Sequence, residues 1–132
     1  MDLNELYENF EFFDSWEEKY QYVIDLGHEL EAFPQEYKTE EWKVQGCQSQ
    51  VWLVPEVKDG KFHFKGDSDA ILVKGIIAIV LLIYNDKSAE EIKSIDVAKI
   101  FAKLGLEENL TPSRRNGMMS MVQKIKSYAL SA

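Results

Sequence analysis

Hydrophobic residues recur at helical spacing in the N-terminal part of the chain. The first such pattern predicts a short amphipathic helix over residues 2–11. A second helix is predicted to begin after Asp14 or Ser15, because each of these is followed three residues later by a glutamate, as in a capping box. This second helix is expected to end near Glu31. The expected inward positions are Leu3, Leu6, Tyr7 and Phe10 in the first helix and Trp16, Tyr20, Val23, Ile24 and Leu30 in the second.

The middle of the chain is typical of strands. Pro34 ends the helical pattern, because the residue before a proline is disfavoured in the α conformation. Extended segments are then predicted over residues 42–46, 49–57 and 61–67 from their β-branched and aromatic residues. The dipeptide Asp59-Gly60 is a strong hairpin signal between the last two segments. A small antiparallel sheet is therefore expected.

The most apolar part of the sequence follows this sheet. Residues 76–83 are apolar without interruption, which predicts an interior helix over 70–84, although β-branched residues leave a strand as the alternative. The turn at 66–69 offers side-chain oxygens that could cap this helix. The run is interrupted at Lys74 and falls short of the roughly 18 apolar residues that a membrane span needs, so no membrane association is expected.

Helical signals dominate the C-terminal part. Short helices are predicted from Ser88 to about Ser94 and from Asp96 to Gly105, and a final helix begins at residues 111–113. The predicted fold class is therefore α+β, with a small three-stranded antiparallel sheet packed with helices, in a single domain over residues 1–132. The inward positions of the final helix are expected to be Met118, Met121, Val122, Ile125 and Tyr128.

The net charge of the chain argues against one class of partner, and the acidic residues are concentrated in the N-terminal region. The net charge is −8, which argues against nucleic acid as a partner. Residues 1–41 contain 13 of the 23 acidic side chains but only two basic ones, Lys19 and Lys38. This asymmetry is compatible with a solvated helix face or with a docking surface for a basic partner.

Cys47 is the only cysteine in the sequence. Gly46 precedes it and permits a positive φ angle, which favours a tight turn that presents the thiol between two strands. The alternative is a small buried cysteine that only packs. A single cysteine makes no internal disulfide, and no secretory leader is recognised, so we expect an intracellular, cytoplasmic protein.

The reactive side chains of this sequence are compatible with few kinds of functional site. One cysteine and two distant histidines, His28 and His63, do not make a zinc site or an iron–sulfur ligand set. Phosphate-binding, dinucleotide-binding and serine-nucleophile motifs are not found, and a Cys–His–Asp hydrolase lacks an evident orienting partner for either histidine. A lone thiol is sufficient for thiol exchange, in which a thiolate attacks the terminal sulfur of a persulfide. Acceptance of sulfur at Cys47 is therefore one interpretation of the lone thiol, and a cysteine that only packs is the other.

Four motifs, in order, resemble the SufE family of sulfur acceptors. They comprise the runs Val44–Trp52, Gly66–Ala70 and Val73–Ala78, together with Leu110–Arg114 followed by Gly117. The resemblance extends from about Trp16 to Ala129, which leaves residues 1–15, the beginning of the acidic N-terminal region, outside it.

This resemblance implies both a reaction and partners. Proteins of this family accept sulfur from a PLP-dependent cysteine desulfurase of the SufS or CsdA type, stimulate that enzyme and pass sulfur to an iron–sulfur scaffold. It implies that Cys47 forms the persulfide and that PLP belongs to the desulfurase, so that this chain has no cofactor or metal of its own and is not itself an enzyme. The motifs do not distinguish SufE-type from CsdE-type acceptors. The alternative is a non-covalent activator or adaptor of a desulfurase, in which Cys47 is only structural.

The residues around Cys47 are expected to support it. Gly46, Gln48 and Ser49 belong to the same loop, and the resemblance places Asp67, Asp69 and Arg114 at motif positions around it. We hypothesise that Arg114 and the turn at 67–69 hold the cysteine loop by hydrogen bonds; the alternative is that they only cap helices.

Overall fold

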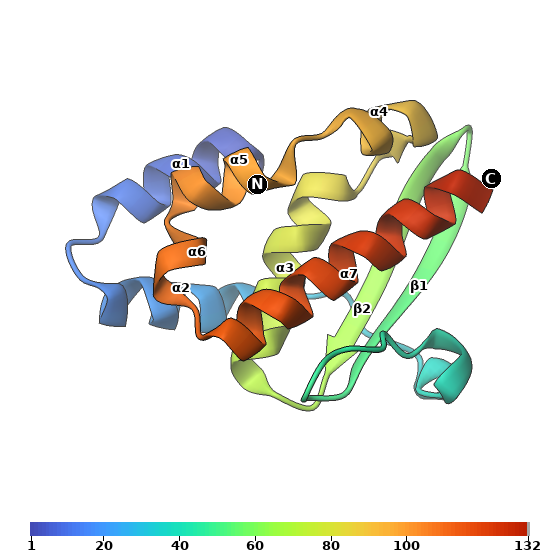
Figure 1. The fold of residues 1–132 in the computed structure, drawn as a ribbon, viewed down its shortest axis with the longest axis horizontal. Coiled ribbons are helices and arrows are strands. Elements are labelled where there is room, and N and C mark those ends of the chain that lie inside the picture. Colours follow the sequence, from blue (N-terminus) through green and yellow to red (C-terminus); the bar gives the residue numbers. More distant parts are fainter. Residues whose placement is uncertain (132) are drawn as a thin grey trace.

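A computed structural model describes residues 1–131 (Figure 1). The chain has an α+β arrangement, as the hydrophobic pattern predicts, with two α-helices before the β1–β2 hairpin and five α-helices after it. The α-helices are α1 (Leu3–Phe12), α2 (Trp16–His28), α3 (Ile71–Tyr84), α4 (Ala89–Ser94), α5 (Val97–Leu104), α6 (Leu106–Asn109) and α7 (Pro112–Ser131). The strands are β1 (Val51–Lys58), β2 (Lys61–Ser68) and β3 (Lys87–Ser88), and two 3-10 helices are η1 (Gln35–Tyr37) and η2 (Glu40–Trp42).

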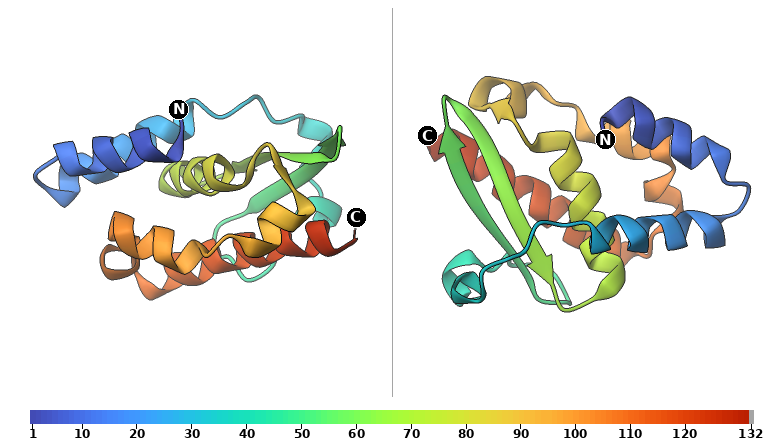
Figure 2. Two further views of the ribbon diagram at one scale, coloured as in Figure 1. Left: turned by 90° about the horizontal axis from the view of Figure 1, so that it is seen from above. Right: turned by 180° about the vertical axis from the view of Figure 1, so that it is seen from behind.

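Helix α3 is the central element of the fold. It lies between a layer formed by α1 and α2 and a layer formed by α5 and α7 (Figure 2). Most of its side chains are buried, as expected for an element that is apolar on every face. No helix within residues 1–131 is long and apolar enough to cross a membrane.

The sheet differs from the prediction in one strand. Strands β1 and β2 pair antiparallel through the hairpin at Asp59-Gly60, as predicted, but the third strand is β3, which pairs with β2. The predicted strand at 42–46 is wrong. Trp42, the first residue of the predicted strand, belongs to η2, and only an isolated β-bridge joins Lys43 to Trp52 of β1. The local 3-10 hydrogen bonds, including Trp42 N–H to the Thr39 carbonyl at 3.2 Å, outweigh strand propensity here.

Capping residues set the starts of several helices where predicted. Ser15 caps α2, Ser88 forms a complete capping box with Glu91 at the start of α4, and Asp96 caps α5. The end of α2 was predicted near Glu31, but the helix stops at His28. The turn at 66–69 gives α3 no side-chain cap, contrary to the expectation.

One continuous hydrophobic core joins the helices to the sheet. Its centre is the face shared by α3, β2 and α7, where Phe64, Ile77 and Ile125 are almost completely buried. The expected inward positions of α7 are buried, apart from Tyr128, which is half-buried and donates its hydroxyl to the Leu53 carbonyl at 3.3 Å.

Helices α2 and α3 cross at a pair of glycines. A Cβ added to Gly75 would lie 2.1 Å from the Val23 carbonyl oxygen, and one added to Gly27 would lie 2.7 Å from the Gly75 nitrogen. Neither distance is compatible with a side chain, so the two backbones touch directly. This crossing holds the acidic α1–α2 layer against the central helix.

A histidine connects three segments near the end of α3. His63 contacts Glu31 through Nε2, and its Nδ1 lies 3.6 Å from Oδ1 of Asp86. Burial of the ring lowers its pKa, but the hydrogen bonds and charges of Glu31 and Asp86 raise it more, so the net pKa of His63 is raised.

This raised pKa predicts a pH-dependent contribution to stability. Because folding favours protonated His63, the contribution is complete below the unfolded-state pKa of about 6.5 and is lost as pH rises through the higher folded-state pKa. Urea unfolding of wild type and His63→Gln should therefore differ most at low pH and converge in alkaline solution. A difference that stays constant with pH would contradict this assignment.

Candidate functional site

The loop that carries Cys47 is closed at its base by strand-like hydrogen bonding. The Val44 N–H donates to the Val51 carbonyl at 2.8 Å, next to the Lys43–Trp52 bridge. Gly46 has a φ angle of +89°, in the left-handed region that favours glycine. The chain therefore reverses direction at Gly46 and places Cys47 against α7.

Cys47 is half-buried rather than fully presented to solvent. Its thiol donates to the Gly117 carbonyl of α7, with 3.7 Å between Sγ and the oxygen. The side chain lines a cavity of about 210 Å³, with an apolar wall that includes Val73, Ile76 and Met121. The thiol is thus held at the surface edge of an apolar pocket between the loop, α3 and α7.

Burial raises the pKa of the Cys47 thiol. The protonated form therefore predominates at neutral pH while the loop rests on α7, and reaction with oxidants is slowed because the thiolate is the reactive species. Movement of the loop into a more polar environment would lower this pKa and activate the sulfur.

Asp69 is hydrogen-bonded to the cysteine loop. Its Oδ1 accepts from the Gln50 N–H at 3.0 Å, and its own N–H points to the Gln50 carbonyl at 3.4 Å. These two contacts fix the end of the loop where it enters β1. The 67–69 turn therefore contacts the loop through Asp69, whereas α3 receives no side-chain cap from it.

Asp67 has a different set of partners. Its carboxylate lies 3.0 Å from the ammonium of Lys38 and 3.5 Å from that of Lys74. Burial raises the pKa of Asp67, but the bond to Lys38, the Ser68 N–H and the charge of Lys74 lower it more, so its net pKa is lowered. Asp67 thus joins the segment after η1 to β2 and α3, and its hydrogen bonds and ion pairs do not include the cysteine loop.

The remaining predicted site residues surround the same cavity. Gln48, Ser49 and Arg114 line it together with Cys47, and Arg114 is half-buried in the first turn of α7. The Arg114 N–H is capped by the Thr111 hydroxyl at 3.3 Å. Arg114 thus lines the thiol pocket, but among residues 1–131 no hydrogen bond joins its guanidinium to the cysteine loop.

Sequence reasoning missed the surface of α7 on which the loop rests. A Cβ added to Gly46 would lie 2.7 Å from Oγ of Ser120, and one added to Gly117 would lie 3.6 Å from Sγ of Cys47. Gly117 and Ser120 are one helical turn apart, so they present a small-residue seat on one face of α7. The only sequence signal for this seat was the glycine in the fourth motif.

Because the loop rests on this seat, we predict that Gly46→Ala exposes Cys47 to solvent. The new methyl group would displace the Ser120 hydroxyl from its present position, and an L-residue at this φ angle costs roughly 1–2 kcal/mol, so the loop should leave α7 more often. Alkylation of Cys47 by iodoacetamide at neutral pH should become several-fold faster than in wild type.

Gly60→Ala is the matched control for this experiment. Gly60 also has a positive φ, of 76°, but a Cβ there would meet nothing within 4 Å. It therefore introduces comparable backbone strain in the β1–β2 hairpin without touching the seat. Equal alkylation rates for Gly46→Ala and wild type would show that the loop is not held by this contact.

The described residues do not suggest a resident metal. Among residues 1–131, no group of three or more histidine, cysteine, aspartate or glutamate side chains is arranged to hold a metal ion. A second cavity, of about 630 Å³, does not include Cys47 and lies among α1, α2, β2 and α3.

Comparison with known proteins gives consistent results. Residues 4–129 match the family described as SufE, an Fe-S metabolism associated domain. The match includes nearly all of the acidic N-terminal segment and so corrects the narrower limits inferred from the motifs. SufE-like proteins of Rhizobium meliloti and Rhizobium etli are 47% and 46% identical to this chain over 131 residues. The alignments cover 96% of this chain in each case, and 94% and 88% of the two relatives.

A solved structure has the same fold. The solution structure of a hypothetical protein from Thermus thermophilus superimposes with a TM-score of 0.77. It covers 98% of this chain and 96% of the other, at 21% sequence identity, and so supports the fold alone. The family match over residues 4–129 and the two bacterial relatives agree with this fold. The chain therefore belongs to the SufE family, whose domain is associated with Fe–S metabolism.

Proposed function

We propose that this chain accepts sulfur on Cys47 from a PLP-dependent cysteine desulfurase and delivers it to iron–sulfur cluster assembly. The observation that carries the proposal is the position of the thiol: Cys47 is half-buried on a loop that turns at Gly46 and rests on α7. A loop attached by few contacts is suited to leave its seat and enter a partner's active site. Family membership supports the Fe–S context of the reaction.

The proposed step is a thiol exchange. The Cys47 thiolate attacks the terminal sulfur of a cysteine persulfide on the donor, a new S–S bond forms at Cys47, and the donor's S–S bond breaks. The donor cysteine leaves as a thiolate and takes up the proton that Cys47 released. Atoms and electrons balance without an external oxidant or reductant, so this chain needs no cofactor for the step, and PLP belongs to the donor enzyme.

The surroundings of Cys47 favour protection before transfer. In the resting position, the raised pKa keeps the thiol protonated and the pocket covers one side of the sulfur. Docking to a desulfurase of the SufS or CsdA type would draw out the loop, and Arg114 would stabilise negative charge on the thiolate or persulfide beside it. In this proposal the chain is a sulfur carrier of the cytoplasm that stimulates its partner and has no turnover of its own.

An adaptor that activates the desulfurase without carrying sulfur is the second candidate. The half-buried position of Cys47 and its contact with Gly117 favour it, because they are also typical of a packing cysteine. The two candidates are separated by the rate of sulfide release from cysteine by the desulfurase in the presence of wild type or Cys47→Ser. The carrier is expected to lose its stimulation in the variant, whereas equal stimulation by both proteins would favour the adaptor.

A further inference from the structure

The segment between α2 and the 3-10 helices depends on side chains for its position. We call residues 31–39 the connector; it leads from the α2 side of the molecule to the side of the hairpin (Figure 2). Its backbone hydrogen bonds join near neighbours, such as the Lys38 N–H to the Gln35 carbonyl at 3.1 Å. Among residues 1–131, no backbone hydrogen bond joins the connector to β1 or β2. Side chains must therefore hold it against the strands.

Lys38 is the connector residue that interacts with both strands of the hairpin. Its ammonium lies 3.0 Å from the carboxylate of Asp67 on β2 and 5.6 Å from the ring centroid of Trp52 on β1. Trp52 and Asp67 are direct partners in the β1–β2 register, so their side chains lie on the same face of the sheet. A cation over an aromatic ring and beside a carboxylate is attracted to both groups. Lys38 thus fixes the connector on this cross-strand pair.

The contact is sheltered from water. The exposed fraction is 27% for the Lys38 side chain and 15% for the Asp67 side chain, and Trp52 is buried. Salt screens a partly buried ion pair less than an exposed one. The second cation near Asp67, Lys74 at 3.5 Å, belongs to α3. Of the two lysines, only Lys38 therefore links the carboxylate to the connector.

The Trp52–Asp67 pair lies at the base of the cysteine loop. On the side where the chain enters the loop, Trp52 forms the isolated β-bridge with Lys43. On the side where it leaves, Asp69 follows Asp67 by two residues and accepts the Gln50 N–H at 3.0 Å. Both attachments of the loop are thus next to the pair, so a displacement of the pair would reach the loop.

We propose that Lys38 is a positioning residue for Cys47, because its contact with Trp52 and Asp67 keeps the base of the cysteine loop closed and the thiol on α7. The hydrogen bonds and ion pairs within residues 1–131 do not join Lys38 to Cys47, so Lys38 acts through the two strands. Without its charge, the base opens more often and the loop leaves α7 more often. What this means for sulfur transfer rests on the function proposed above, whereas the position of the thiol does not.

The test is the rate at which iodoacetamide alkylates Cys47 in Lys38→Met. Methionine keeps a long unbranched side chain over Trp52 but removes the charge. The chain has a single cysteine, so the mass of the intact protein reports the reaction of Cys47 alone. Alkylation at neutral pH should be several-fold faster than in wild type, and the Gln50 amide should exchange its hydrogen faster. Lys38→Arg keeps a cation that binds both a carboxylate and an aromatic ring, so it should restore a rate close to that of wild type.

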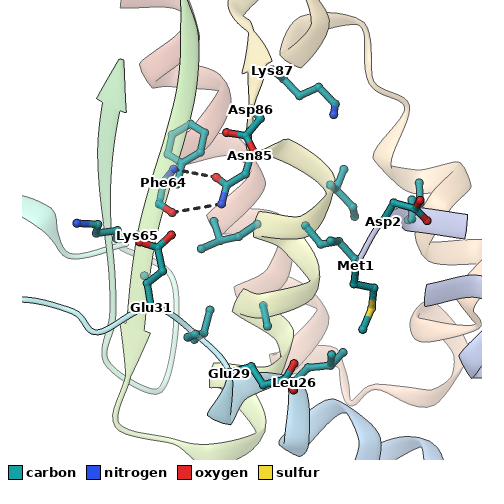
Figure 3. Close-up of a pocket in the computed structure, with 17 residues that line it drawn as sticks. Met1, Asp2, Leu26, Glu29, Glu31, Phe64, Lys65, Asn85, Asp86 and Lys87 are labelled. Atoms are coloured by element: carbon teal, nitrogen blue, oxygen red, sulfur yellow. Dashed lines mark hydrogen bonds between the residues drawn. The ribbon is translucent and has the colours of Figure 1, made fainter. Parts of the chain in front are cut away.

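Lys65→Met is the matched control. Lys65 lies on the same strand as Asp67, and its side chain points away from the cavity drawn in Figure 3. Its ammonium lies 3.2 Å from the carboxylate of Glu56 on β1, and its side chain is 26% exposed, so this pair also joins the two strands and is buried to the same extent on the lysine side. Glu56 lies nearer to the hairpin turn than to the cysteine loop. Lys65→Met should therefore leave the alkylation rate at the wild-type value.

A double-mutant cycle tests the route through Asp67. Asp67→Asn removes the negative charge while nearly keeping the shape of the side chain, and it should also speed alkylation. If Lys38 and Asp67 act through one contact, the double variant should react no faster than the faster single variant. Two effects that multiply in the double variant would contradict this route.

The comparison of the two lysine variants decides the proposal. Faster alkylation in Lys38→Met than in Lys65→Met, with rescue by Lys38→Arg, would support it. A wild-type rate in Lys38→Met would overturn it, and so would an equal increase in both variants, because that increase would reflect a general loss of stability. If Lys38→Met does not fold, Lys38→Gln makes the same comparison.

Sulfur transfer is a separate readout. After loading by a desulfurase with PLP and cysteine, the added sulfur should be lost to dithiothreitol several-fold faster from Lys38→Met than from wild type, because the loop shelters it less. If wild type gains no sulfur, the proposed function fails, but the alkylation rates still decide whether Lys38 positions Cys47.

Discussion

Replacing Cys47 by serine is expected to lower sulfur delivery to an iron–sulfur scaffold by at least about 100-fold, because a serine hydroxyl neither ionises near neutral pH nor forms a persulfide. The fold should be unaffected. The serine hydroxyl occupies nearly the same position and has a hydrogen-bond acceptor in the Gly117 carbonyl, so the free energy of unfolding should change by less than about 1 kcal/mol.

Cluster formation on the scaffold, with desulfurase and cysteine supplied, is the measurement that checks this expectation. Cys47→Ala serves as a second variant that lacks the hydroxyl, and it should be equally inactive. Ser49→Ala is a control from the same loop, because it keeps the thiol while changing another residue of the pocket. Substantial delivery by Cys47→Ser at unchanged desulfurase concentration would show that sulfur does not travel through this residue.

The second large effect is expected for stability, at the crossing of α2 and α3. Gly75→Val should lower the free energy of unfolding by about 3 kcal/mol, because the new side chain would meet the Val23 carbonyl and the helices would have to separate. This is a large fraction of the roughly 5–15 kcal/mol that stabilises an ordinary domain. Gly75→Ala should cost less, since the higher helix propensity of alanine offsets about 1 kcal/mol of the clash.

Urea unfolding of both variants tests the crossing. Ala78→Val, one turn later on α3, adds the same side chain at a half-buried position and should cost less than about 1 kcal/mol, because Ala78 lines the cavity of about 630 Å³ and has room for it. Equal losses for Gly75→Val and Ala78→Val would mean that the close approach of the two backbones does not limit packing.

Local patterns in the sequence were sufficient for most of the fold. Ser88 and Asp96 satisfy backbone donors within one turn of themselves, so the starts of α4 and α5 can be predicted without tertiary information. The interior position of α3 follows from its uniform hydrophobicity. Elements with a weak local signal were missed: β3 has only two residues, and α6 only four.

The strand predicted at 42–46 failed for a physical reason. Trp42 has high strand propensity, but its ring packs edge-to-face against Tyr37, with 6.1 Å between centroids, at the end of a 3-10 turn. Strand propensity depends on having neighbours to pair with, and only Lys43 finds one on β1.

The candidate site was predicted in part. The turn at Gly46 follows from residue types, and the structure brings Gln48, Ser49 and Arg114 to the same pocket, but the thiol is half-buried and not at an accessible tip. The contact between Cys47 and Gly117 joins residues 70 positions apart, so no local pattern could reveal it. The cavity of about 630 Å³ likewise depends on α1, α2, β2 and α3 meeting in space.

The most direct test of the central claim is intact-protein mass spectrometry after incubation with a cysteine desulfurase, PLP and cysteine. Wild type should gain the mass of one sulfur atom, a reductant should remove it, and Cys47→Ser should gain none. Peptide mapping should place the added sulfur on the loop that contains Cys47. No mass gain with an active cognate desulfurase, or the same gain in Cys47→Ser, would contradict the proposal that Cys47 carries the sulfur.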